Sequence, residues 1–231
     1  GESGSGKTTM ATALMRLTRP PGRINGGRVL LGDVDLLQLD DRGLQQVRLR
    51  DIALVPQGAM NSLNPVMRIG HQMKDAIEAH ESGRISKKAM DERIANQFAR
   101  VGLPPTVANR YPHELSGGMK QRVSIARGLV QDPPVLLMDE PFAALDEQTR
   151  MTMGHELLRI WSQTRKTVVF ITHSLTEAVY LADEVLVMSP RPGRIIDRVP
   201  VTLPRPRTYE MMATDTFGKL RERIWQQIRK A

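Results

Sequence analysis

The sequence contains no cysteine, few aromatic residues and no long apolar run. Without cysteine among the 231 residues, neither a disulfide framework nor a thiolate metal site can form, which fits a reducing compartment. No segment approaches the roughly 18 to 20 apolar residues that cross a bilayer. No secretory signal precedes the first motif. Any membrane role is therefore expected to depend on partner proteins.

Aromatic residues make up 4% of the chain, and the formal net charge is +8. Positive charge favours nucleic acids, but no aromatic residues are interleaved with the basic ones and no nucleic-acid-reading motif is present. We interpret the basic C-terminal residues as a solvated face near an anionic membrane surface, with nucleic-acid binding as the alternative. They are Arg191, Arg194, Arg198, Arg205, Arg207, Lys219, Arg221, Arg223, Arg229 and Lys230.

A complete phosphate-binding loop opens the chain, Gly1-Glu2-Ser3-Gly4-Ser5-Gly6-Lys7-Thr8. Its glycines let the backbone approach phosphate oxygens closely, and its amides lie at a helix N-terminus, which favours anions. We expect Lys7 to reach the β- and γ-phosphates and the Thr8 hydroxyl to bind Mg²⁺. The residues of this loop expected to bind nucleotide are Gly1, Ser3, Gly4, Gly6, Lys7, Thr8 and Thr9.

A second glycine-rich turn, Leu115-Ser116-Gly117-Gly118, stands at the start of another expected helix. The Ser116 hydroxyl and the amides of Gly117 and Gly118 predict a second anion-binding site. One chain therefore carries two phosphate-binding surfaces.

Two adjacent carboxylates, Asp139 and Glu140, follow the apolar run at 135–138. A buried strand there would deliver both to the carboxyl edge of a sheet, where Mg²⁺ and phosphates are expected to lie. We assign metal binding to Asp139, and we expect Glu140 to orient or deprotonate the attacking water. The alternative is that one of the two merely caps the following turn.

Gln57 and His173 also follow apolar runs of strand length, at 52–55 and 168–171. The Gln57 amide can contact Mg²⁺ or water at the end of its strand. The His173 imidazole N–H can donate to the γ-phosphate. Asp146 is expected to be the N-cap of a helix that starts near Glu147. The remaining histidines are interpreted as surface or core residues, and they are His71, His80, His113 and His155.

Together these motifs resemble those of the ATP-binding-cassette ATPases, over residues 1 to about 192. Leu-Ser-Gly-Gly is the signature of that family, and Met119 stands where many members carry glutamine. The resemblance implies ATP and Mg²⁺ as cofactors, and a head-to-tail dimer in which each ATP lies between the loop of one subunit and the signature of the other.

The resemblance also implies a role for each polar residue at the strand ends. It makes Asp139 the metal-binding residue and Glu140 the catalytic base. It makes Gln57 the residue that couples the nucleotide to the helical insert. Asp146 would contact the opposite subunit in addition to capping its helix.

Free-standing cassettes of this kind resemble importer ATPases. The residues at 55–65 and 111–114 are similar to the oligopeptide, dipeptide and nickel group, whereas those at 141–146, 172–178 and 189–195 look like the nitrate, sulfonate and taurine group. The implied partners are a second ATPase subunit, permease subunits and, indirectly, an extracellular substrate-binding protein. These partners would place the chain at the cytoplasmic face of a membrane. They do not identify the transported substrate.

The expected fold is α/β, a phosphate-loop NTPase with a mainly parallel sheet flanked by helices and an inserted helical subdomain. Residues 1–57 and 132–190 are assigned to the core, 58–131 to the helical subdomain and signature helix, and 191–231 to a basic tail. Strands are expected at 28–31, 52–55, 135–138, 168–171 and 185–188, and helices at 7–17, 148–163, 175–181 and 217–230. Apolar residues at helical spacing define the insert, namely Ile69, Met73, Ile77, Met90, Ile94 and Phe98.

Members of this family carry a strand and an adenine-stacking aromatic residue before the phosphate loop. The sequence starts at Gly1 and is therefore expected to be a fragment that hydrolyses ATP poorly or not at all. Two alternatives to an importer subunit are considered. One is a cassette ATPase that acts on nucleic acid or ribosomes, and the other is an interaction module that does not hydrolyse ATP. The presence of Glu140 and His173 argues against the second.

Overall fold

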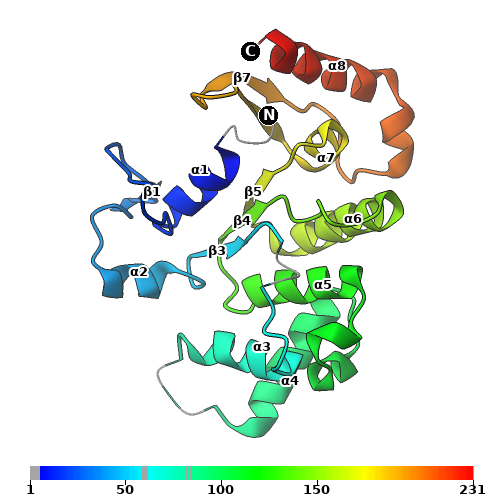
Figure 1. Ribbon diagram of the computed structural model, residues 1–231. Coiled ribbons are helices and arrows are strands. Elements are labelled where there is room, and N and C mark those ends of the chain that lie inside the picture. Colours follow the sequence, from blue (N-terminus) through cyan, green and yellow to red (C-terminus); the bar gives the residue numbers. More distant parts are fainter. Residues whose placement is uncertain (1–5, 59–61, 82, 84, 231) are drawn as a thin grey trace.

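Three parallel strands form the centre of the computed structural model, which describes residues 6–58, 62–81, 83 and 85–230. They are β3 (Ile52–Val55), β4 (Val135–Asp139) and β5 (Thr167–Ile171), in the order β3-β4-β5. Helices α1 (Lys7–Leu14) and α6 (Glu147–Thr164) lie on opposite sides of these strands in Figure 1. Strand β4 is buried over 136–139, as its run of apolar residues predicts.

The register of these strands brings their carboxyl ends to one edge. Val55 is opposite Met138, and Asp139 is opposite Ile171. The strands expected at 52–55, 135–138 and 168–171 are confirmed, with boundaries that agree within one residue. Because all three run in the same direction, the residues that follow them leave the sheet on the same side.

A helical insert follows β3, as the sequence predicts. It contains α3 (Ile69–Glu78), α4 (Lys87–Arg100) and α5 (Gly117–Gly128), which lie together in Figure 1. All six apolar residues that defined it are buried. Helix α5 approaches the sheet closely at Gly128, where a Cβ would lie 3.2 Å from Cγ2 of Val55. A side chain at this glycine would push the insert away from β3.

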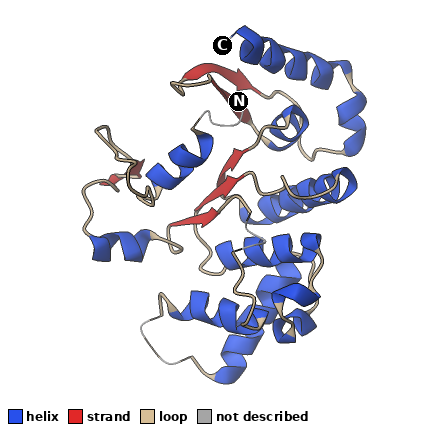
Figure 2. Cartoon of the chain, viewed as in Figure 1, coloured by secondary structure: helices blue, strands red, loops and turns tan. Residues whose placement is uncertain are grey.

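The strand expected at 185–188 is confirmed as β6 (Glu184–Met188), but its expected place in the parallel sheet is wrong. It pairs antiparallel with β7 (Ile195–Pro200) in a separate hairpin, which Figure 2 shows beside the central strands. The prolines around the turn obscured β7, although Ile195, Ile196 and Val199 are β-branched residues that favour strands. The assigned domain boundary at 190 passes through this hairpin.

A cavity of about 510 Å³ separates β5 from β6. Its walls come from both strands and from α1 and α8 (Asp215–Lys230). In the part of the chain that the structure describes, β5 pairs only with β4 and β6 only with β7. The apolar lining includes Met10, Val168, Phe170, Leu186, Ile224 and Ile228.

The basic tail is not uniformly solvated, because Arg207 is 3% exposed. Its guanidinium donates to the carbonyls of Val179, Tyr180 and Ala182 at 2.9, 2.9 and 2.7 Å, at the end of α7 (Leu175–Leu181). Burial lowers the pKa of Arg207 to about 10. Arginine is favoured at this position because the last carbonyls of a helix lack partners within it.

Small elements near the N-terminus complete the fold. A short hairpin pairs β1 (Leu30–Leu31) with β2 (Val34–Asp35). Helix α2 (Asp41–Val47) was not predicted, although its N-cap signal is in the sequence: the Asp40 carboxylate accepts the Gly43 N–H at 2.7 Å. Across the described residues, every helix is too short or too polar to span a membrane.

Candidate functional site

The phosphate-binding loop leads directly into α1. Gly1, Ser3 and Gly4 lie outside the described residues, whereas Gly6 is the N-cap of α1 with φ +89°. This left-handed conformation favours glycine, and a glycine N-cap has no side chain to occupy the first amides of the helix. The N–H groups in the first turn, from Lys7, Thr8 and Thr9, are therefore suited to bind phosphate.

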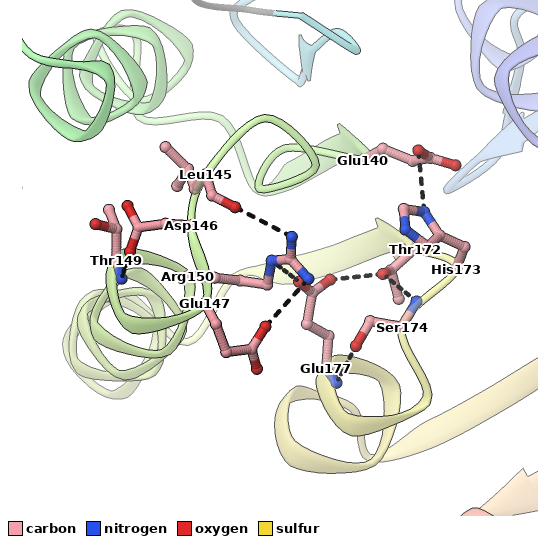
Figure 3. A network of polar contacts seen from close by, with 10 residues as sticks. All are labelled: Glu140, Leu145, Asp146, Glu147, Thr149, Arg150, Thr172, His173, Ser174 and Glu177. Carbon is pink, nitrogen blue, oxygen red and sulfur yellow. Dashed lines mark hydrogen bonds and ion pairs between the residues drawn. The ribbon is translucent and has the colours of Figure 1, made fainter.

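Three expected catalytic residues converge on one carboxylate oxygen. His173 Nδ1 lies 3.2 Å from Oε2 of Glu140, as Figure 3 shows. Gln57 Nε2 donates to the same oxygen at 3.4 Å. The residues are far apart in sequence and meet because each follows one of the three parallel strands. The carboxylate of Glu140, the expected base, is thus in contact with both the imidazole of His173 and the amide of Gln57.

Glu140 is held in a strained conformation. Its φ is +44°, and its N–H donates to the Ile171 carbonyl at 2.9 Å. A residue with a Cβ in this region costs about 1–3 kcal/mol. The sequence contained no sign of this strain. The turn aims the glutamate at His173 instead of letting β4 continue.

Asp139 is 2% exposed, and its Oδ1 has no hydrogen-bond partner among the described residues. Burial raises the pKa of Asp139, and the nearby charge of Glu140 adds to this rise; a hydrogen bond with the Thr8 side chain and the charge of Lys7 act in the opposite direction. A buried carboxylate with an unused oxygen, beside a threonine hydroxyl, has the chemistry of a Mg²⁺ site.

Ser116 and Asp146 each begin a helix. The Ser116 hydroxyl accepts the Met119 N–H at 3.3 Å, and the Asp146 carboxylate accepts the Thr149 N–H at 2.9 Å. The Thr149 hydrogen bond lowers the pKa of Asp146. The N-cap interpretation of Asp146 is therefore confirmed.

The two expected phosphate-binding surfaces are separated in the chain. Helix α5, which starts at Gly117, and helix α1 lie apart in Figure 1 with the parallel strands between them in that view. The signature is instead a neighbour of α6: a Cβ on Gly118 would lie 3.3 Å from Cγ2 of Thr149. The signature and the residues around Asp146 therefore form one continuous surface.

Two of the remaining histidines have structural contacts, as expected. His155 Nδ1 lies 3.5 Å from the Tyr180 hydroxyl, and its ring is 5.5 Å from that of Tyr209. His113 stacks on Tyr111 with ring centroids 5.6 Å apart. Sequence reasoning missed a different group, the polar network of Arg150, Thr172 and Glu177 beside His173 (Figure 3).

Replacing Asp139 with asparagine should stabilise the nucleotide-free protein. The folded-state pKa of Asp139 is raised above its unfolded value of about 3.9, so ionising it costs stability as the pH rises through that range. In Asp139→Asn we expect a Tm about 2–4 °C higher at pH 7, equivalent to about 1 kcal/mol for a chain of this size, measured by calorimetry.

This gain should disappear below about pH 4, where the unfolded chain is protonated as well. Asp146→Asn is the matched control, because it replaces an exposed N-cap with another good one and should not raise the Tm. A gain in Asp139→Asn that persists unchanged at low pH would contradict the electrostatic explanation.

Comparison with known sequences agrees with this site. The family model for ABC transporters matches residues 1–143. The dipeptide transport ATP-binding protein DppD of Caldanaerobacter subterraneus subsp. tengcongensis is 43% identical over 189 residues, which is 81% of this chain and 58% of that protein. The oligopeptide transport ATP-binding protein OppD of Bacillus subtilis is 39% identical, over 81% of this chain and 53% of its own length. The chain thus spans little more than half of these two relatives.

Other matches cover nearly the whole chain. An ATP-binding protein of Brucella abortus biovar 1 is 38% identical over 99% of this chain and 80% of its own length. Among solved structures, the dimeric ATP-binding cassette MJ0796 bound to ADP and Pi has a TM-score of 0.75 and 28% identity, covering 88% of this chain and 84% of that one. With its phosphate loop, its signature and the carboxylates at the end of β4, the chain belongs to the ABC transporter family, as an ATP-binding cassette.

Proposed function

We propose that this chain is the ATP-hydrolysing subunit of a membrane importer that takes up peptides. The observation that carries the proposal is the convergence of Gln57 and His173 on the Glu140 carboxylate, next to the buried Asp139. The identities to DppD and OppD support peptides as the substrate class. The similarity of the later segments to the nitrate, sulfonate and taurine group stays a prediction, as does the division into core, helical subdomain and tail.

Each residue of the site has a role in this proposal. The loop amides and Lys7 bind the phosphates, and Thr8, Asp139 and Gln57 hold Mg²⁺. The ion, when bound, neutralises charge on the phosphates. Glu140 orients or deprotonates the attacking water. His173 turns Nδ1 toward Glu140, so its Nε2 is the ring nitrogen left for the γ-phosphate. With Nδ1–H donated to the carboxylate, Nε2 can donate to the phosphate only from the doubly protonated ring.

The second phosphate-binding surface requires a second cassette. Helix α5, which begins at Gly117 after its N-cap Ser116, lies apart from α1 in Figure 1. Ser116, Gly117 and Gly118 are therefore proposed to contact the ATP held by a partner copy. Asp146, which shares their surface, contacts the same partner. The dimeric state of the similar MJ0796 cassette supports this arrangement.

In a chain that carries an added strand before Gly1, Glu140→Gln should bind ATP but turn it over about 10² to 10⁴ times more slowly than the same chain with Glu140, because the base is lost while the phosphate-binding groups remain. The variant should accumulate as an ATP-bound dimer. Phosphate release measures the first effect, and size-exclusion chromatography with multi-angle light scattering measures the second.

Adding Ser116→Arg to Glu140→Gln supplies the control. A bulky cation at the signature should abolish the dimer but leave ATP binding to the single chain nearly unchanged. If Glu140→Gln hydrolysed ATP nearly as fast as the chain with Glu140, this residue would not be the catalytic base. Loss of ATP binding in the double variant would show that Ser116 serves its own chain's nucleotide.

The segment at 62–68 is proposed to dock a helix of the permease. Val66 at its tip is 79% exposed, which is unusual for a large apolar side chain. The segment is nevertheless ordered, because the buried Gln72 side chain bonds to the backbone of Asn64 and Met67. Arg127 of α5 also donates to the Ser62 hydroxyl at 2.8 Å. A rigid loop that presents an apolar tip, a few residues after Gln57, can link nucleotide binding to a partner.

Cross-linking can test this surface, since the chain has no native cysteine. Val66→Cys should cross-link to the permease, with a yield that changes when ATP and vanadate are added, because a coupled partner must bind the two nucleotide states differently. Arg221→Cys in α8 is the exposed control and should not react. Cross-links from position 221 but not from 66 would move the coupling surface to the basic tail.

We also propose that the cavity between β5 and β6 holds one further parallel strand, directly before the phosphate-binding loop. Its support is the apolar lining of the cavity and the facing edges of β5 and β6, which pair with no other strand among the described residues. A strand that leads into such a loop and then a helix is the usual form of this motif. Such a strand would join the two sheets.

Attaching a strand-forming segment of five alternating valine and isoleucine residues before Gly1 should therefore raise the Tm and strengthen ATP binding. The same segment with a central proline is the control, because proline has no backbone N–H to donate to a neighbouring strand. Equal Tm values for the two fusions, measured by calorimetry, would contradict the additional strand.

A further inference from the structure

The loop that carries His173 is held on both sides by Glu177 (Figure 3). The Thr172 hydroxyl donates to Oε2 of Glu177 at 2.5 Å, and the same hydroxyl oxygen accepts the Ser174 N–H at 2.9 Å. The Ser174 hydroxyl in turn accepts the Glu177 N–H at 3.3 Å and caps α7. The residues before and after His173 are therefore both bonded to Glu177.

Arg150 connects Glu177 to the segment that follows Glu140. Its Nε lies 3.5 Å from Oε1 of Glu177, and its Nη2 donates to the Leu145 carbonyl at 3.1 Å. Leu145 directly precedes Asp146. One guanidinium thus connects the loop after β4 to the first turn of α7, which follows the loop of His173.

This connection is shielded from solvent. The side chain of Glu177 is 13% exposed and that of Arg150 is 22% exposed. Burial raises the pKa of Glu177, while the Thr172 hydrogen bond and the Arg150 charge oppose the rise. Shielded polar groups tolerate little rearrangement, because any movement that separates them leaves a charge without a partner. The two loops are therefore held in one relative position.

We propose that Glu177 is a positioning residue, which sets His173 against Glu140 through Thr172 and ties that geometry to Asp146 through Arg150. The inference rests on the proposed function, in which Asp146 contacts a second cassette. A partner that displaces the residues around Asp146 then acts on Arg150, on Glu177 and finally on the loop of His173. Neither Glu177 nor Arg150 needs to touch the nucleotide.

Thr172→Val tests the link, because it removes the hydroxyl but nearly keeps the side chain's shape. We expect kcat for ATP to fall about tenfold and KM to stay within about twofold, since the nucleotide-binding groups are intact while the geometry of the reacting groups is not. Thr172→Ser keeps the hydroxyl and should retain kcat within about twofold. A role in stability alone would not produce this separation of kcat from KM.

A second readout does not depend on catalysis. The imidazole Hε1 resonance of His173, followed by NMR in the nucleotide-free chain, should move in Thr172→Val and stay in place in Thr172→Ser. Glu177→Gln should move it as well, because the amide cannot pair with the Arg150 charge. Glu147→Gln is the control for charge loss beside Arg150: its side chain is 72% exposed, it has no bond to Thr172, and it should leave the resonance unchanged.

Two results would overturn the proposal: kcat equally affected in Thr172→Val and Thr172→Ser, or a His173 resonance that does not respond to Thr172→Val. If Thr172→Val fails to fold, Glu177→Gln and Glu147→Gln give the same comparison. An unaltered chain that binds no ATP would count against the proposed function instead, and the NMR comparison would still decide the role of Glu177.

Discussion

The parallel pairing of β3, β4 and β5 is the constraint on which the rest of the site depends. Each strand ends in polar residues, and the register brings these ends together although they are separated by more than 80 residues between Gln57 and Glu140 and by more than 30 between Glu140 and His173. The helical insert lies between Gln57 and Glu140 in the sequence, and α6 lies between Glu140 and His173. Only the pairing of the strands brings these three residues together. A shift of one residue in the register of one strand would turn that strand's side chains to the other face and displace the polar residue that follows it.

The acidic residues at this edge of the sheet lower the stability of the folded chain, and apolar packing around β4 offsets that loss. Glu140 has a positive φ, and Asp139 carries a carboxyl group in a place that disfavours its ionised form. Both features orient acidic groups toward the space where a cation and phosphates are proposed to bind. The apolar packing around β4, including the fully buried Met138 and Phe142, offsets their cost. Strain confined to a functional edge is typical of sites in which geometry matters more than local stability.

Polar contacts also make the loops around the site into a single unit. Glu177 and Arg150 join the residues around Asp146 to the loop of His173, and Thr149 places the start of α5 beside α6. The surface proposed to face a second cassette is therefore continuous with the groups proposed to act on ATP. Such continuity is a physical basis for coupling between two nucleotide sites, since both belong to one packed network.

The sequence by itself determined the class of fold, the parallel strands and the identity of the polar residues at their ends. Short-range signals were sufficient there: apolar runs for the strands, helical spacing for the insert, and the N-cap residue Asp146 for α6. Only the tertiary structure decided that β6 pairs with β7, that Arg207 is buried, that Glu140 is strained and that Glu177 holds the His173 loop. Each of these depends on contacts between residues distant in sequence or on a backbone angle, and neither leaves a pattern in a single sequence.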